Sequence, residues 1–125
     1  MLPEEKRIQD SLQKVYNAGS QSKYIMEIIS YIANNYANSD ISIQSIADSL
    51  KLSQSHLSHT FKNETGTTLS DYLTKYRMLK AIELLHDCRN RIGEVSEAVG
   101  YRDLTYFSYL FKKEVGVSPS AFQGK

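Results

Sequence analysis

An all-α fold is predicted for this chain by three features of its sequence. Apolar residues recur at the spacing of one helix face over most of its length, as Ile25, Ile28 and Ile32 do near the start. Residues that cap helices, and glycines that end them, divide these runs at short intervals. The two-residue alternation of a half-buried strand appears nowhere. We therefore expect helices around a core that a chain of 125 residues is long enough to bury.

The most informative stretch runs from Ile92 to Pro119, IGEVSEAVGYRDLTYFSYLFKKEVGVSP. Gly100 lies where a first short helix must end, because glycine tolerates the left-handed conformation of a helix end. Asp103 follows as the expected N-cap of a second helix. Two short helices joined by a tight turn that contains glycine predict a helix-turn-helix over about residues 92–116.

The same unit occurs earlier, over about residues 43–66, IQSIADSLKLSQSHLSHTFKNETG. Ile46 corresponds to Val95 at an offset of 49, and Phe61 corresponds to Phe111 at an offset of 50. The slip of one residue falls in the turn, where an extra residue is tolerated. Two copies are too few for a solenoid, so we expect a duplicated domain with two equivalent projecting helices.

A helix from about Leu69 to His86 is predicted between the two units. Thr68 and Asp71 resemble a capping box, with Asp in place of the usual Glu. The apolar residues of this helix cover more than one face: Leu69, Tyr72, Leu73, Tyr76, Leu79, Ile82, Leu84 and Leu85. A helix packed on a single core needs only one apolar stripe, so this linking helix is expected to be shared by two lobes.

The remaining segments complete a prediction of seven helices over residues 23–125. A strong apolar stripe from Tyr24 to Tyr36 predicts a helix that supports the first unit, and Ser118-Pro119 predicts a short closing helix over the second. Residues 1–22 are predicted to be a linker or interdomain segment. Their weak helical pattern fits either an interdomain helix or a frayed end, and we favour the frayed end because short terminal helices rarely order alone.

Charge and composition restrict the classes of function that this chain can have. The net charge is only +1, but residues 51–125 hold eleven Lys/Arg against eight Asp/Glu, a local excess of three positive charges. No apolar run is long enough to span a membrane, no signal peptide is visible, and the single cysteine predicts a reducing cytoplasm. The sequence shows no phosphate-binding glycine loop, paired carboxylate site or nucleophile motif, so we do not expect an enzyme.

A metal or other cofactor is not expected either. His56 and His59 lie three residues apart, and His86 is near Cys88. No paired Cys/His spacing completes a set of four ligands from these residues.

The sequence resembles the DNA-binding domain of AraC/XylS-type transcription regulators over about Tyr24 to Gln123. The second unit carries the more specific part of the resemblance, VGYRDLTYFSYLFKKEVGVSPSAF. Within that family the chain looks most like the output domains of two-component response regulators. The resemblance implies two helix-turn-helix lobes joined by a long helix. It also implies a bacterial, cytoplasmic protein whose partners are double-stranded DNA and RNA polymerase, with a homodimer formed through N-terminal or missing regions.

Four positions depart from the family pattern. His59 and Tyr109 stand where members often carry Arg, the residue that most commonly makes a bidentate contact to guanine. Ser96 replaces the usual Ala at a tight contact between helices, and is small enough to fit. Gln123 replaces a terminal Arg, which removes one phosphate or packing contact.

The face of each second helix that lies opposite its buried residues is expected to meet the DNA groove. With the apolar Leu and Phe side chains pointing inward, the predicted base contacts are Ser55, Ser58, His59, Thr105, Ser108 and Tyr109. The predicted phosphate contacts are Ser53, Lys62, Arg102, Lys112 and Lys113. The simplest alternative for each residue is a solvated helix face, and the alternative function is a helical protein-interaction module without DNA binding.

Overall fold

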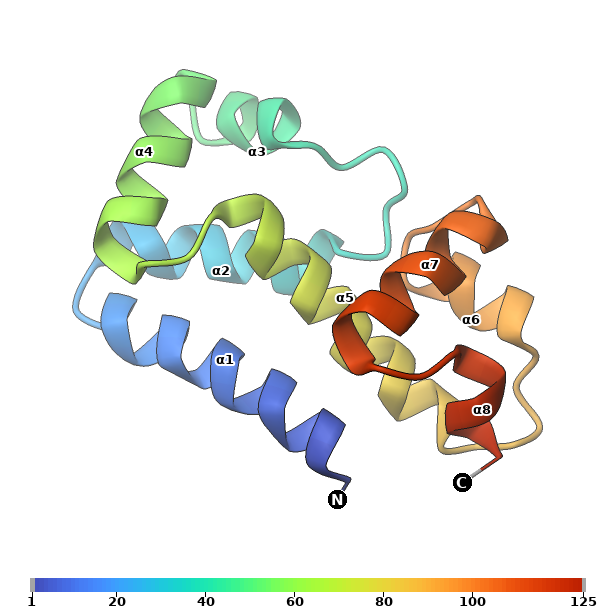
Figure 1. The fold of residues 1–125 in the computed structure, drawn as a ribbon. Coiled ribbons are helices and arrows are strands. Elements are labelled where there is room, and N and C mark those ends of the chain that lie inside the picture. Colours follow the sequence, from blue (N-terminus) through green and yellow to red (C-terminus); the bar gives the residue numbers. More distant parts are fainter. Residues whose placement is uncertain (1, 125) are drawn as a thin grey trace.

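The computed structural model describes residues 2–124, which contain eight helices and their short connections (Figure 1). In chain order they are α1 (Pro3–Gly19), α2 (Lys23–Asn35), α3 (Ile43–Ser49), α4 (Gln54–Thr65), α5 (Leu69–Leu85), α6 (Ile92–Ala98), α7 (Leu104–Val115) and α8 (Pro119–Gln123). The all-α prediction is confirmed. Seven of the eight helices lie in the region where seven were expected, and α1 is the additional one.

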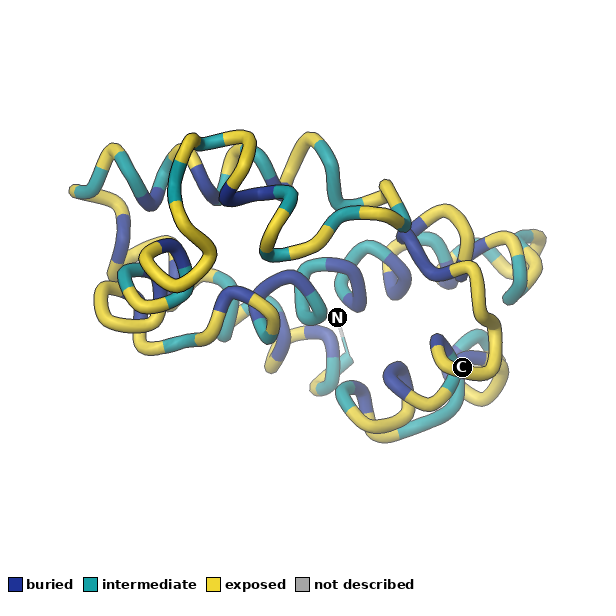
Figure 2. Tube along the Cα trace, turned by 90° about the horizontal axis from the view of Figure 1, so that it is seen from above, coloured by how far each residue is buried: buried dark blue, intermediate teal, exposed yellow. Residues whose placement is uncertain are grey.

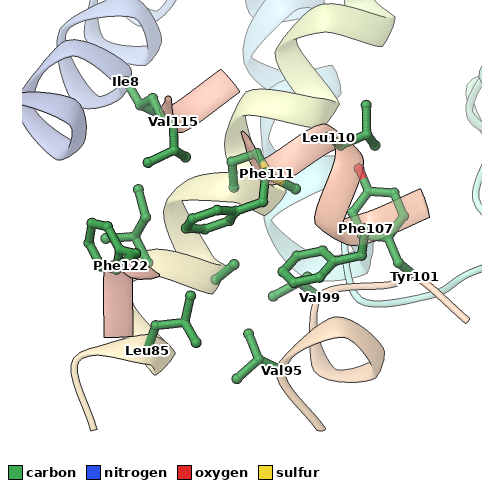
Figure 3. Close-up of a cluster of buried hydrophobic side chains, with 13 residues drawn as sticks. Ile8, Leu85, Val95, Val99, Tyr101, Phe107, Leu110, Phe111, Val115 and Phe122 are labelled. Atoms are coloured by element: carbon green, nitrogen blue, oxygen red, sulfur yellow. The ribbon is translucent and has the colours of Figure 1, made fainter. Parts of the chain in front are cut away.

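The linking helix α5 contributes to two separate cores, as its apolar residues on several faces predicted. Its first half supplies Leu69, Tyr72 and Leu73 to the core of a first lobe, and its second half supplies Met78 and Ile82 to that of a second lobe. The first core consists of Val15, Ile25, Ile28, Ile32, Ile46, Ala47, Leu57, Phe61, Leu69, Tyr72 and Leu73. The second consists of Ile8, Met78, Ala81, Ile82, Leu85, Val95, Val99, Tyr101, Phe107, Leu110, Phe111, Val115 and Phe122 (Figure 3).

The sequence duplication is also a duplication of structure. Helices α3 and α6 each have 7 residues, and α4 and α7 each have 12. In the first turn the backbone N–H of Leu52 donates to the carbonyl of Ala47 at 2.9 Å. In the second, that of Tyr101 donates to Ser96 at the same distance, which is the same bond displaced by 49 residues. The extra residue of the second unit is Arg102, which precedes the N-cap of α7.

The two turns reach the left-handed conformation with different residues. Gly100 has φ +100°, whereas its counterpart Lys51 has φ +60° and is the one non-glycine residue with positive φ in residues 2–124. A Cβ on Gly100 would lie 2.7 Å from the carbonyl oxygen of Tyr36 and 2.8 Å from Nη2 of Arg77, so the second turn has no room for a side chain. Glycine is therefore required at position 100 for two independent reasons.

Polar caps begin the helices largely where the sequence placed them. The side chains of Thr68, Asp103 and Ser118 each accept a hydrogen bond from the backbone N–H three residues on, at 3.1–3.2 Å. The predicted capping box at Thr68 is only half present, because the Asp71 carboxylate pairs instead with Lys75 at 2.8 Å. A reciprocal capping box forms at the start of α3, between Ser42 and another serine three residues on.

The predicted frayed end is wrong, because α1 is packed against both lobes. Ile8 lies in the second core and Val15 in the first, each 2% exposed. The guanidinium of Arg7 donates to the carbonyl of Glu114 at the end of α7. Figure 2 shows the inward sides of the helices buried and their outward turns exposed. A terminal helix orders when its apolar stripe is covered on assembly, which local propensity alone does not reveal.

No helix in residues 2–124 combines the length and apolar character needed to cross a membrane.

Candidate nucleic-acid interface

Helix α4 exposes a polar stripe opposite its buried side. Leu57 and Phe61 are fully buried against the first lobe. Ser55 and His59 are exposed, and Ser58 is partly exposed, as the helical spacing predicted. These three residues are called the α4 face below. Ser58 and His59 follow Ser55 by three and four positions, so both lie beside it on the helix surface.

Helix α7 repeats this arrangement in the second lobe. Phe107 and Phe111 are fully buried, whereas Thr105 is exposed, Ser108 is partly exposed and Tyr109 is 61% exposed. The last three residues, called the α7 face below, stand 50 positions after the corresponding residues of the α4 face. The six predicted base contacts therefore form two matching strips, one on α4 and one on α7. These two helices lie in different lobes (Figure 1).

Three of the five predicted phosphate contacts have local partners. The hydroxyl of Ser53 caps α4 by accepting from the N–H of His56 at 3.1 Å. The ammonium of Lys62 donates to the carbonyl of Gly66 at 2.9 Å, and so stabilises the end of the same helix. Arg102 pairs with Asp40 at 3.3 Å on the surface. Exposed pairs of this kind are worth at most about 1 kcal/mol, so a phosphate can compete for Arg102.

Lys112 and Lys113 remain as the two cations placed in the last turn of α7, and both are exposed. Cations there also interact favourably with the negative end of the helix dipole.

Helices α4 and α7, the second helices of the two units, are called the recognition helices below. Three of their exposed residues are not among the contacts predicted from the sequence. Tyr106 is 52% exposed and Leu104 is 45% exposed, both near the start of α7, and Gln54 is exposed at the start of α4. The offset of 50 pairs Gln54 with Leu104 and His56 with Tyr106, but it does not reveal that these side chains are exposed, which only the structure shows. First-turn residues of a recognition helix are well placed to reach base edges.

A fourth residue that the sequence did not reveal is Arg77, which ties the two lobes together from the middle of α5. It is 7% exposed, and it donates from Nε to the carbonyl of Tyr36 at 2.9 Å and from Nη2 to that of Asn38 at 3.0 Å. Its guanidinium carbon lies 4.9 Å from the centroid of the Tyr101 ring in the second turn. One side chain thus holds both the segment that follows α2 and the turn that precedes α7.

Burial raises the pKa of the Tyr101 phenol, and the neighbouring Arg77 opposes that rise. A phenol with a raised pKa is neutral at physiological pH. The contact with Arg77 is therefore one between a cation and a neutral aromatic ring.

The two substitutions at packing positions are also accounted for. Ser96 is 1% exposed and its hydroxyl donates to the carbonyl of Tyr101 at 2.8 Å, so the extra oxygen is satisfied inside the turn. Gln123 donates to the carbonyl of Asn90 at 2.7 Å, which ties α8 to the connection between α5 and α6.

Two of the three histidines contact other side chains of the protein. His86 lies 2.9 Å from the carboxylate of Glu5, and the ring of His56 packs edge-on against Tyr24. Within residues 2–124, no three His, Cys, Asp or Glu side chains gather as a metal site would require.

Two helix-turn-helix units on a shared helix, each with an exposed second helix, define a two-lobed DNA-binding domain of the transcription-regulator class. A family model described as a helix-turn-helix domain matches residues 46–125. The C-terminal domain of AraT, a response regulator from Geobacillus stearothermophilus, is 39% identical with a TM-score of 0.80, over 82% of this chain and 85% of that one. The chain belongs to the AraC-type family, a family of DNA-binding transcription regulator domains and not of enzymes.

Two further relatives show how much of a longer protein this family domain represents. The C-terminal domain of the two-component response regulator yesN from Fusobacterium nucleatum is 33% identical with a TM-score of 0.76, over 78% of this chain and 95% of that domain. The transcriptional regulatory protein HptR of Staphylococcus aureus is 30% identical over 113 residues. That match takes in 90% of this chain but only 44% of HptR.

Proposed function

We propose that this domain binds double-stranded DNA in a sequence-specific manner and is the output domain of a transcription regulator. The observation that carries the proposal is the duplicated recognition helix. Both copies bury large apolar residues at the same positions on one side and expose a strip at the same positions on the other. A solvated surface has no need of two such strips in register, whereas two half-sites on DNA do.

In this proposal the α4 face and the α7 face contact base edges in two major grooves. The DNA phosphates are contacted by Lys62, Arg102, Lys112, Lys113 and the N-terminus of α4 at Ser53. The 17 residues of α5 make it roughly 26 Å long at ~1.5 Å per residue, whereas successive major grooves on one side of DNA are about 34 Å apart. The DNA is therefore expected to bend toward the protein, or one helix to insert less deeply.

Two relatives support a proposal about the protein to which this domain belongs. AraT and yesN are described as response regulators, and the matched part of each is its C-terminal domain. By analogy, residues 23–125 are the DNA-binding domain and residues 1–22, with α1, connect it to a regulatory part. RNA polymerase and a second copy of the full regulator are the proposed protein partners, and the bacterial cytoplasm is the proposed location.

A gel-shift titration at several salt concentrations tests the proposal. Binding should weaken steeply as salt rises, because phosphate contacts release counterions from DNA. The double substitution Lys112→Ala/Lys113→Ala should weaken binding to all sequences alike and reduce the salt slope by about 2. The charge-matched control Lys6→Ala/Lys14→Ala removes two lysines of α1 and should leave the slope unchanged.

The low net charge favours the alternative, a helical module that binds another protein. If no DNA is retarded at low salt, the alternative is the better account of the two exposed strips.

A further inference from the structure

The two recognition helices expose side chains of different chemistry. Within residues 2–124 the exposed large hydrophobic side chains are Tyr16, Leu104, Tyr106 and Tyr109, and three of these four belong to α7. At the positions 50 residues earlier, α4 carries Gln54, His56 and His59, which are all polar. The shared residues of the two strips are small and hydroxylated, so the difference lies in these three pairs.

This difference predicts two ways of reading DNA. Gln and His side chains donate and accept hydrogen bonds, and so distinguish bases by their polar edges. Apolar side chains recognise the one apolar group in the major groove, the C5 methyl of thymine. Tyr109 is 61% exposed, and a tyrosine at such a surface presents a large apolar ring with a single hydroxyl.

The structure also orients the aromatic pair. Tyr106 and Tyr109 are three residues apart, so their side chains are neighbours on the same side of α7. The ring of Tyr106 rests edge-on against Tyr101, with the centroids 6.0 Å apart. Tyr101 is 8% exposed, and the guanidinium of Arg77 packs on its ring. Tyr106 therefore packs against a buried ring that is itself fixed in place.

We infer that the second recognition helix reads thymine through its methyl groups, with Tyr106 and Tyr109 as the specificity-determining residues and Leu104 beside them. The first recognition helix reads polar base edges with Gln54 and His59. The operator is then asymmetric, with a thymine-rich half facing α7. This inference rests on the proposed function, because it specifies what the α7 face recognises once it lies in a major groove.

Two observations favour DNA as the occupant of this aromatic surface over a protein. The surface stands 50 residues after the polar strip of α4, at the equivalent positions of the second helix in a matching helix-turn-helix unit. Lys112 and Lys113 follow it on the same helix, so the aromatic strip ends in two exposed cations where a phosphate backbone would pass.

The test begins with selection of binding sites from random double-stranded DNA by the full chain. A second selection with Tyr109→Ala identifies the half of the site that loses its preference. Deoxyuridine then replaces thymine in each half separately, which removes only the methyl group. In the α7 half, wild-type affinity should fall roughly fourfold for each contacted methyl, from ~0.8 kcal/mol per buried CH₂. In the α4 half the same replacement should change affinity less than twofold.

Variants complete the experiment. With Tyr106→Ala/Tyr109→Ala, deoxyuridine in the α7 half should no longer weaken binding, whereas His59→Ala should keep the full deoxyuridine effect. Tyr109→Ala alone repeats the measurement if the double variant melts lower, because Tyr109 is largely exposed.

Three outcomes would overturn the inference but leave DNA binding intact. They are a selected α7 half without thymine, no loss of affinity on deoxyuridine replacement, or an equal loss with the tyrosine variants. Failure of the wild-type chain to bind any DNA would instead refute the proposed function, and the inference with it.

Discussion

Replacing Arg77 with Met removes the central tie between the lobes while keeping a side chain of similar length. Arg77 makes two partly buried hydrogen bonds to backbone carbonyls, of Tyr36 and Asn38, at 2.9 and 3.0 Å. Bonds from a charged donor contribute about 1.5–3 kcal/mol each. Burying Met avoids the desolvation of a cation, and Asn38 is an exposed residue, so the net loss should be about 2–4 kcal/mol.

Thermal and urea unfolding of Arg77→Met measures this loss. For a domain of this size, a loss of about 2–4 kcal/mol corresponds to a lower Tm by roughly 10 °C. Arg102→Met is the matched control, since Arg102 joins the same connecting segment through an exposed pair with Asp40 and should change stability by less than about 1 kcal/mol. A Tm for Arg77→Met within 2 °C of wild type, on the order of the measurement error, would show that the carbonyls find other partners and that Arg77 is not the tie.

Three further predictions concern the second turn, the terminal helix and the first recognition helix. Gly100→Ala should destabilise the fold by at least about 3 kcal/mol, whereas Gly66→Ala, which has positive φ but nothing within 4 Å of its Cβ, should lose only about 1–2 kcal/mol in the same melts. Ile8→Asp should lower the free energy of unfolding by more than about 3 kcal/mol, because it buries an unpaired charge. Lys14→Asp, on the exposed side of α1, should not lower it by that amount. Equal melting temperatures of the two variants would mean that α1 is not docked in solution. His59→Arg should raise affinity by about 1–3 kcal/mol for sites with guanine opposite α4, and unchanged site selection would place His59 away from the bases.

Much of this molecule follows from local sequence patterns. The linking helix was predicted over about Leu69 to His86 and is observed over Leu69–Leu85. The second recognition helix begins after its Asp103 cap and ends at Val115, next to the predicted end of the unit at about residue 116. Periodicity predicts such elements because the burial of a Phe or Leu at one position determines which neighbours, three and four residues away, face water.

The duplication adds to what local patterns can reveal. Because the two units align with each other, the buried residues of one unit identify those of the other. The residues on the opposite side of each second helix then form the two exposed strips. Their division between a polar and an aromatic helix is likewise readable from the aligned residues, once the offset of 50 is known. The exposure of Tyr106 and Leu104 still required the structure, because a single aromatic or Leu at a helix start is as often buried as exposed.

The arrangement of the lobes was decided only by tertiary contacts. Arg77 lies in a helix of mixed pattern, where an Arg is ordinarily solvated, and its partners lie 41 and 39 residues away in the chain. Helix α1 has a weak pattern of its own and is ordered because Ile8 and Val15 enter two different cores. Local spacing sets which side of each helix is apolar. Backbone carbonyls outside helices and incompletely covered core residues acquire their partners only when the helices assemble. The periodicity of the sequence therefore does not predict those partners.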